Sequence, residues 1–294
     1  MIARLAQEAL LEEVYTTPKP GLVDCHDTGA HTDMDCQTFE KSAAAIAPYI
    51  AVMYELGGRW RDAPQGLFCA LRPLGLQAEQ AMLAATDGVN THKGAIFTFA
   101  ILAAAAGHCA AQGVRLTPQL IGAYAAKMTR EPLEREFAAI HGRMPKTHGE
   151  VLYCKYGIKG VRGQAQQGFP VITNLLCPLL QGLRRQGCDP QRVNLQLLLE
   201  SMAVLEDTCI LSRGTSDDLA WIQRQAAALL AQGGAFAPDA AQKLLALNTS
   251  CVQRNISPGG SADFLAAALF LEKLIRREYY ERNGSYADRY AALP

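Results

Sequence analysis

Apolar residues recur along this chain at spacings of three and four, the repeat that places side chains on one face of an α-helix. At the start of the chain, Leu5, Ala9 and Val14 share such a face, and Glu8 and Glu13 lie off it. No run of alternating apolar and polar residues bounded by turns indicates a sheet. The pattern therefore predicts an all-α protein of about ten helices.

Proline, glycine and capping residues predict where these helices begin and end. Gly57 and Gly58 follow the helix expected at residues 39–56, so we expect the two glycines to end it. Thr117 followed by Pro118 is a cap with proline at the first helical position. The expected helices span residues 2–15, 39–56, 74–86, 95–106, 117–129, 193–211, 217–232, 238–253 and 265–274.

The most apolar stretch, Ala95 to Ala106, has almost no polar atom. A membrane span needs about 20 apolar residues, so this shorter run is expected to be a core helix and no membrane partner is expected. With 294 residues and 49% hydrophobic content, the chain can fill one large core. We expect one helical domain over residues 1–275 and a polar, aromatic tail over residues 276–294.

Charge and cysteine usage narrow the class of protein further. Lys plus Arg and Asp plus Glu are both 28, so the net charge is zero and gives no reason to expect a nucleic acid as a partner. A local basic pocket for a small anion is compatible with this balance. The nine cysteines include no Cys-x-x-Cys pair, and the first residues do not resemble a signal peptide. Both features indicate a cytoplasmic protein with mostly buried thiols.

The first loop, residues 18–35, is rich in polar residues. It contains Lys19, Asp24, His26, Asp27, His31, Asp33 and Asp35. The loop can be a solvated connection in which Asp35 caps the next helix. It can also be a functional site, because carboxylate oxygens suit Mg²⁺ and a histidine beside an aspartate suits general-base catalysis.

A second polar loop, residues 88–94, leads directly into the most apolar helix. The first turn of a helix has N–H groups without intrahelical partners and a partial positive charge, and both favour an anion. Gly94 would let the backbone approach a ligand, and Lys93 supplies a mobile cation for a phosphate. Alternatively, Asn90 or Thr91 caps the helix and Lys93 faces solvent, since the spacing of a P-loop is absent.

Two later segments are rich in glycine. Residues 147–170 include Arg162 and are either a second anion contact or a long surface loop. Residues 254–263 form a turn into the last expected helix, where Ser261 with Asp263 resembles an N-terminal cap. Both segments therefore stay candidates for ligand contacts.

Asp207 lies near the end of the apolar helix expected at residues 193–211. A buried carboxylate needs a partner, which Arg213 or a metal ion can supply. A simple cap or ion pair is the alternative.

Four of these loops, in this order along the chain, resemble one enzyme family. The segments are Pro18-Lys-Pro-Gly-Leu-Val with Gly29-Ala-His-Thr-Asp-Met, then Gly88-Val-Asn-Thr-His-Lys-Gly-Ala-Ile-Phe, then Gly160-Val-Arg-Gly with Gly168-Phe-Pro, and then Asn255-Ile-Ser-Pro-Gly-Gly-Ser-Ala-Asp. The set resembles the triphosphoribosyl-dephospho-CoA synthases. The resemblance runs from about Arg4 to Leu274, nearly the whole chain.

The resemblance implies an all-helical enzyme whose substrates are ATP and 3′-dephospho-CoA. In this family the 2′-hydroxyl of the dephospho-CoA ribose attacks the anomeric carbon of the ATP ribose, and adenine leaves. The product is the prosthetic-group precursor of citrate lyase or, in a sister branch, of malonate decarboxylase. Lys93 stands where the malonate branch more often has Arg, which favours citrate lyase. A separate transferase then attaches the product to an acyl carrier protein, and a homo-oligomer is possible.

This chemistry assigns roles to the matching positions. Displacing a base from an anomeric carbon passes through an oxocarbenium-like state that a carboxylate stabilises, and the acceptor hydroxyl needs a general base. The catalytic candidates are Asp24, His31, Asp33 and His92. The nucleotide-binding candidates are Lys19, Asn90, Thr91, Lys93, Gly94, Arg162, Arg213, Asn255, Ser257, Gly259, Gly260, Ser261 and Asp263. Asp33 and Asp207 are candidates for binding Mg²⁺.

The chain departs from the family pattern at one place. The family usually reads Arg-Gly-Glu-Ala-Glu where this chain has Gln164 and Gln166. Glutamine keeps the shape of glutamate and loses its charge, so Gln164 is left out of the catalytic set. Two other functions stay open: a nucleotide glycohydrolase with water as acceptor, and a non-catalytic helical protein that binds CoA-like nucleotides.

Overall fold

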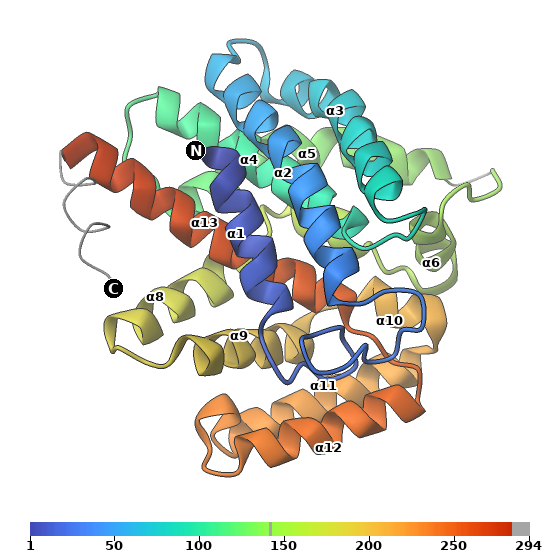
Figure 1. The fold of residues 1–294 in the computed structure, drawn as a ribbon. Coiled ribbons are helices and arrows are strands. Elements are labelled where there is room, and N and C mark those ends of the chain that lie inside the picture. Colours follow the sequence, from blue (N-terminus) through green and yellow to red (C-terminus); the bar gives the residue numbers. More distant parts are fainter. Residues whose placement is uncertain (141–142, 284–294) are drawn as a thin grey trace.

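Thirteen α-helices make up the computed structural model, which describes residues 1–140 and 143–283 (Figure 1). No strand occurs in these residues, which confirms the all-α prediction. The helices are α1 (Ile2–Val14), α2 (Cys36–Arg59), α3 (Pro64–Ala85), α4 (Lys93–Ala111), α5 (Pro118–Ile140), α6 (His148–Tyr156), α7 (Gly160–Gln166), α8 (Cys177–Arg185), α9 (Pro190–Val204), α10 (Thr208–Arg213), α11 (Ser216–Ala231), α12 (Ala240–Gln253) and α13 (Gly259–Asn283). A π-helical turn at Val171–Leu176 leads into α8, and a 3₁₀ turn at Gly234–Phe236 precedes α12.

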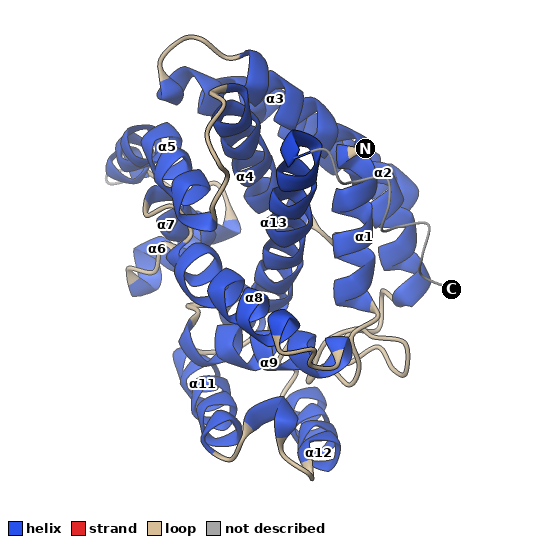
Figure 2. Cartoon of the chain, turned by 90° about the vertical axis from the view of Figure 1, so that its left-hand side faces the viewer, coloured by secondary structure: helices blue, strands red, loops and turns tan. Residues whose placement is uncertain are grey.

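Helices α4 and α13 form the centre of the molecule and pack side by side (Figure 2). Phe99 of α4 stacks on Phe270 of α13, with ring centroids 4.9 Å apart. Helix α4 is buried on nearly every side, which is typical of a helix that is apolar all round and enclosed by other helices. Helices α2, α3 and α5 pack against α4, and α1, α8 and α9 pack against α13.

Helix α4 is longer than the apolar run that predicted it. By length and composition, its 19 residues could cross a membrane. The argument that the apolar run is too short to span a membrane is therefore wrong. However, 72% of its apolar window is buried inside the protein. Burial therefore identifies α4 as a core helix.

Gly57 and Gly58 do not end α2, so that prediction is wrong. Helix α2 continues to Arg59, and Gly57 lies directly against α4, where a Cβ atom would overlap the carbonyl of Ala104. Gly107 of α4 lies in the same way against the carbonyl of Tyr54 in α2. The two glycines let the helix backbones approach closely, and α2 and α4 form the most extensive helix pair.

Helices α3 and α5 are both longer than expected. Helix α3 begins at Pro64, well before residue 74, and α5 continues past residue 129 to Ile140. Each contains an internal proline, yet packing against α4 and against each other holds both helices together. Tertiary contacts thus outweigh the local preference of proline to end a helix.

Two other expected segments have a different secondary structure. The glycine-rich residues 147–170 contain two helices, α6 and α7, in place of a loop. Thr147 caps α6 at its start, and Gly157, with φ of 72°, ends it. The segment 193–211 is interrupted between α9 and α10, because Asp207 starts a new helix as its N-cap.

Helix α13 continues beyond residue 275 to Asn283, so the first part of the expected tail is helical. In this part, Glu278 is buried and accepts a hydrogen bond of 2.7 Å from the hydroxyl of Tyr54. Residues 284–294 of the expected tail lie outside the described residues.

Replacing Gly57 with alanine should lower the free energy of unfolding, because the new Cβ must displace the Ala104 carbonyl. Overpacking of this kind typically costs about 1–3 kcal/mol. Gly58→Ala is the matched control, since the nearest atom to its Cβ position is 3.5 Å away. Alanine is favoured over glycine in a helix by about 1 kcal/mol, so the control should be neutral or stabilising. Chemical denaturation measures both variants, and equal stabilities would contradict the close contact.

Candidate active site

Three loops that lie far apart in the sequence meet helix α10 around one cavity of about 220 Å³. The loop after α1 approaches α10, where Arg213 donates a hydrogen bond of 3.0 Å to the carbonyl of Ala30 (Figure 1). The predicted residues that line the cavity are Lys19, His31, Asn90, Thr91, His92, Lys93, Gly94, Arg213, Ser257, Gly259 and Asp263. The predicted residues outside its lining are Asp24, Asp33, Arg162, Asp207, Asn255, Gly260 and Ser261.

A buried ion pair forms one wall of this cavity. Glu13 of α1 and Lys19 of the following loop are only 3% and 2% exposed, and their charged groups are in contact. Removing one partner of such a pair leaves an uncompensated buried charge, so each residue requires the other. The expectation that Glu13 lies off the buried face is wrong, because Lys19 gives it a buried partner. Its burial could not be read from helical periodicity.

Asp24 and Asn248 hold the loop after α1 in shape. The Asp24 carboxylate accepts hydrogen bonds from the backbone N–H groups of Lys19 at 2.9 Å and Asp27 at 3.1 Å. Asn248 of α12 accepts from the N–H of Gly21 at 2.8 Å and donates to Asp27 at 2.9 Å. Both side chains are buried within this network. The geometry thus favours a structural role for Asp24, and Asn248 is a loop-holding residue that the sequence motifs did not reveal.

His31 lies between Arg213 and Ser257. Arg213 donates to its Nδ1 atom at 3.0 Å, so the ring proton sits on Nε2, which donates to the Ser257 hydroxyl at 2.8 Å. Burial and the charge of Arg213 lower the pKa of His31. Asp33, whose carboxylate is 3.7 Å from Nδ1, acts in the opposite direction. The charge state of His31 therefore depends on which of these two neighbours faces Nδ1.

His92, at the start of α4, presents one ring nitrogen without a partner. Thr91 donates to the Ser42 hydroxyl at 2.7 Å, which leaves the Ser42 proton to be donated to Nδ1 of His92 at 2.6 Å. The ring proton is then on Nε2, which is buried and has no hydrogen-bond partner in the described part of the chain. Burial and the nearby Lys19 charge lower the pKa of His92 to about 3. His92 is thus a neutral donor on the cavity wall.

The residues around His92 shape the first turn of α4. Asn90 accepts a hydrogen bond of 3.2 Å from the N–H of Lys93, which is the capping role considered for it. The Lys93 side chain is 61% exposed and reaches Glu79 of α3 at 2.9 Å. A Cβ atom at Gly94 would overlap the carboxylate of Asp263. Only glycine therefore allows Asp263 to approach this turn.

Asp263 is a partly buried acid in the first turn of α13. Burial, the charge of Glu13 and the charge of Asp207 raise its pKa well above the ordinary value of 3.8. A carboxyl group in this state keeps its proton and can donate a hydrogen bond. Asp263 and His92 therefore both face the cavity as neutral groups.

Asp207 joins the start of α10 to the start of α13. One oxygen accepts hydrogen bonds from the N–H groups of Cys209 at 2.9 Å and Gly260 at 3.2 Å. The other accepts from the N–H and hydroxyl of Ser261, at 2.9 and 3.1 Å. Both oxygens are thus occupied. This geometry favours the capping role for Asp207, with Gly260 and Ser261 as its donors.

Three further motif residues lie away from the cavity. Arg162 is on α7, 4.0 Å from Glu136, and lines a separate groove. Asn255 is exposed, and its φ of 55° forms the left-handed turn that follows α12. The side-chain oxygen of Gln164 is buried and makes no hydrogen bond within the described residues.

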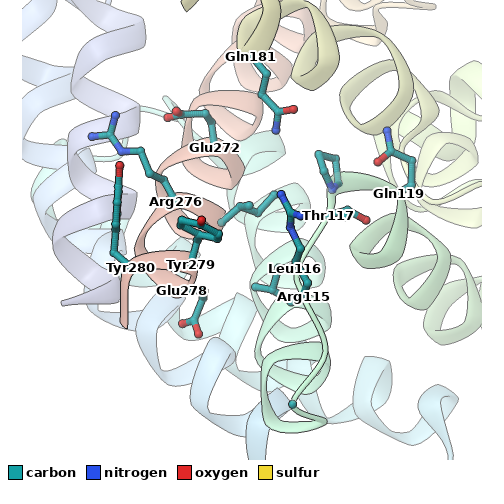
Figure 3. A pocket seen from close by; sticks show the side chains of 13 residues that line it. Arg115, Leu116, Thr117, Gln119, Gln181, Glu272, Arg276, Glu278, Tyr279 and Tyr280 are labelled. Carbon is teal, nitrogen blue, oxygen red and sulfur yellow. The ribbon is translucent and has the colours of Figure 1, made fainter. Parts of the chain in front are cut away.

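A larger cavity, of about 640 Å³, lies elsewhere (Figure 3). It is lined by the C-terminal half of α13, the connection before α5 and Gln181 of α8. Its carboxylates are paired, because Arg184 donates to Glu272 at 2.7 Å and Tyr54 donates to Glu278 at 2.7 Å. None of the predicted site residues lines it, so size alone does not identify the chemical site.

The side chains do not form a metal centre on their own. No group of three or more His, Cys, Asp or Glu residues in the described ranges is arranged to hold an ion. Of the two metal candidates, Asp207 has both oxygens occupied by donors, and the side chain of Asp33 is 59% exposed. The donor set therefore does not fit a resident Mg²⁺ ion.

Asp263→Asn should stabilise the protein increasingly as pH rises. In the wild type, the unfolded chain releases the Asp263 proton near its ordinary pKa of 3.8, whereas the folded chain retains it because its pKa is raised. Folding therefore weakens as pH rises above this value, and a neutral asparagine removes that loss. Thermal unfolding of both proteins from pH 5 to pH 8 tests this. A melting-temperature difference that does not grow with pH would show that Asp263 is ionised in the fold.

Ser42→Ala should change the tautomer of His92, because Nδ1 loses its donor. Nitrogen-15 NMR of the imidazole reports which nitrogen carries the proton. Ser201→Ala is the control, since Ser201 is 0% exposed in α9 and its hydroxyl has no partner in the described residues. Unchanged His92 signals in Ser42→Ala would refute this tautomer assignment.

Comparison with known proteins assigns a family to this constellation. The chain matches the CitG family, described as ATP:dephospho-CoA triphosphoribosyl transferase, over residues 1–282. It is 38% identical over 280 residues to the 2-(5''-triphosphoribosyl)-3'-dephosphocoenzyme-A synthase of Escherichia fergusonii, covering 95% of this chain and 92% of the relative. It is 39% identical over 277 residues to the probable synthase of Vibrio cholerae serotype O1, covering 94% and 88%. The corresponding protein of Citrobacter koseri is 40% identical over 273 residues, covering 92% and 90%.

No solved structure matches the chain. The family and the relatives agree over nearly the full length, and three of the four motif segments that carry the resemblance meet at one cavity, whereas the segment with Arg162 lies outside it. The chain therefore belongs to the CitG family of ATP:dephospho-CoA triphosphoribosyl transferases.

Proposed function

We propose that the cavity between these three loops and α10 binds the triphosphate and ribose of ATP and is where the sugar is transferred. As a member of its family, the enzyme forms 2′-(5″-triphosphoribosyl)-3′-dephospho-CoA from ATP and 3′-dephospho-CoA and releases adenine, making the prosthetic-group precursor of citrate lyase. The observation that carries the location is the meeting of the α4 and α13 N-termini with Lys19, Lys93 and Arg213 on one cavity.

The triphosphate binds at the start of α4 in this proposal. The N-terminal turn of a helix offers backbone N–H groups and a partial positive charge. His92 lines this cavity and its Nε2–H is an unused donor among the described residues, and Thr91, Asn90 and Gly94 complete the turn. Lys93 and Arg213 are mobile cations at the rim and add charge without being buried.

His31 and Asp33 form the base in this proposal. Arg213 occupies Nδ1 of His31, and a bound phosphate would draw this guanidinium away. Asp33 is then the nearest charged partner of Nδ1, and a carboxylate there raises the basicity of the ring. With the ring proton on Nδ1, facing Asp33, Nε2 can accept the proton of the 2′-hydroxyl as it attacks the anomeric carbon. Positioned proton transfer of this kind typically contributes about 10²–10⁴-fold.

Asp263 is the acid for the leaving base in this proposal. Adenine leaves more easily when it is protonated, and a carboxyl group with a raised pKa retains the proton that this step needs. Ser257 and Gly259 lie on the same side of the cavity, where they can contact the nucleoside. The oxocarbenium-like ribose then lies between His31 and Asp263.

Mg²⁺ enters this scheme with the substrate. Magnesium in nucleotide sites usually keeps several waters and binds substrate phosphates together with one or two carboxylates. We propose that the triphosphate supplies most of its ligands and that Asp33 is the nearest protein carboxylate able to join them. No step of the transfer is assigned to the metal.

The product's further use is also a proposal. A triphosphoribosyl group leaves a reactive triphosphate on the product, which suits a second transferase that attaches the prosthetic group to an acyl carrier protein of citrate lyase. Both proteins are proposed partners, as is a cytoplasmic location where their substrates occur. The malonate decarboxylase pathway is the alternative destination.

Adenine release tests the reaction. The purified protein with ATP, Mg²⁺ and 3′-dephospho-CoA should release adenine, and omission of dephospho-CoA should abolish the release. Lys93→Ala should reduce kcat/KM about tenfold, because a charge-assisted contact to phosphate is lost. Arg135→Ala, which removes an exposed arginine paired with Glu131, is the control. Adenine release without the acceptor would indicate a glycohydrolase, and ATP binding without any release would indicate a non-catalytic protein.

A further inference from the structure

A groove on the neighbouring face of α4 adjoins the proposed reaction cavity. Its floor is formed by Ile96, Phe97, Ala100 and Ile101. These residues follow Lys93 at spacings of three, four, seven and eight, so Lys93 heads the same helix face. Lys93 also lines the reaction cavity, and its ammonium pairs with Glu79, which lines the groove. The cavity and the groove therefore meet at Lys93.

The groove combines apolar walls with positive charge. Phe68 and Leu71 of α3 and Leu133 of α5 provide apolar surface beside the α4 floor. Arg72 of α3 and Arg162 of α7 both face the carboxylate of Glu136. Two arginines thus meet one carboxylate at this end of the groove, and their guanidinium groups offer donors to a polar ligand.

The reaction cavity is too small for both substrates. Sites for drug-sized ligands usually enclose about 300–1,000 Å³, whereas this cavity measures about 220 Å³ and must hold a triphosphate and a ribose. The acceptor carries a diphosphate and a long pantetheine arm with amide and dimethyl groups. Its arm must therefore lie outside the cavity, in a channel that starts close to the attacking ribose.

The dimensions of the groove agree with this arm. The α4 face from Lys93 to Ile101 is about 12 Å long at the rise of an α-helix. A pantetheine arm has the length of an extended peptide of four residues, about 14 Å. The groove has a volume of about 300 Å³, which is sufficient for one narrow amphipathic chain.

We propose that this groove binds the pantetheine arm of dephospho-CoA, with the acceptor diphosphate near Lys93 and the two arginines facing the polar groups of the arm. The inference rests on the proposed function of the adjoining cavity. It gives Arg162, which belongs to one of the four family motifs, a role in binding the acceptor. It also explains why a residue of that motif lies outside the reaction cavity.

Gly75→Leu tests the groove without disturbing the fold. Gly75 lines the groove, and a Cβ atom placed on it meets no atom within 4 Å, so a leucine side chain would fill the space that the arm needs. Leucine is also favoured over glycine inside a helix such as α3. Gly182→Leu on α8 is the matched control, because Gly182 is equally open and does not line the groove.

Steady-state adenine release should show that Gly75→Leu raises KM for dephospho-CoA about tenfold and leaves KM for ATP unchanged. The control should change neither value. Isothermal titration with 4′-phosphopantetheine, which needs no turnover, should detect binding to the wild type and not to Gly75→Leu.

An unchanged KM for dephospho-CoA in Gly75→Leu would overturn the inference, and so would an equal rise for both substrates. Binding of 4′-phosphopantetheine that Gly75→Leu abolishes, in a protein that releases no adenine, would support the groove and refute the proposed reaction. Adenine release that Gly75→Leu does not alter would support the proposed reaction and refute the groove.

Discussion

The ion pair between Glu13 and Lys19 sets the electrostatics of the whole cavity. Burial and then the charge of Lys19 lower the pKa of His92, and burial and then the charge of Glu13 raise the pKa of Asp263, so both groups are held in their neutral forms. Burial acts in the same direction on both, because it disfavours the charged state of an acid and of a base alike. A cavity that contains neutral donors can accept an anionic substrate without first neutralising a carboxylate.

Helix packing determines which atoms reach this cavity. The glycine contact between α2 and α4 lets their backbones approach, and Ser42, near the start of α2, is then close enough to donate to His92 at the start of α4. The contact between Ser42 and His92 and the glycine contact several turns away thus belong to the same α2–α4 pair.

The helical fold could be predicted from periodicity and caps, and the errors have specific causes. Gly57 was expected to end a helix, because local preference cannot show that another backbone lies beside it. Residues 147–170 were expected to form a loop, although Thr147 and Gly157 are ordinary start and stop signals. Ser42 and Asn248 have no distinctive sequence context, since their function arises only from partners far along the chain.

Asp207 and Asp263 show why motifs located the site better than they assigned its roles. Both are acids at the start of a helix, Asp207 buried and Asp263 partly buried, and a sequence cannot distinguish them. The difference lies in the donors: Asp207 accepts hydrogen bonds from Gly260 and Ser261, and these bonds fix the first turn of α13. Asp263 follows in the same turn, where Gly94 leaves room for its carboxylate. Asp207, whose oxygens both accept hydrogen bonds, thus positions Asp263, which retains its proton. Only Asp263 is available for chemistry.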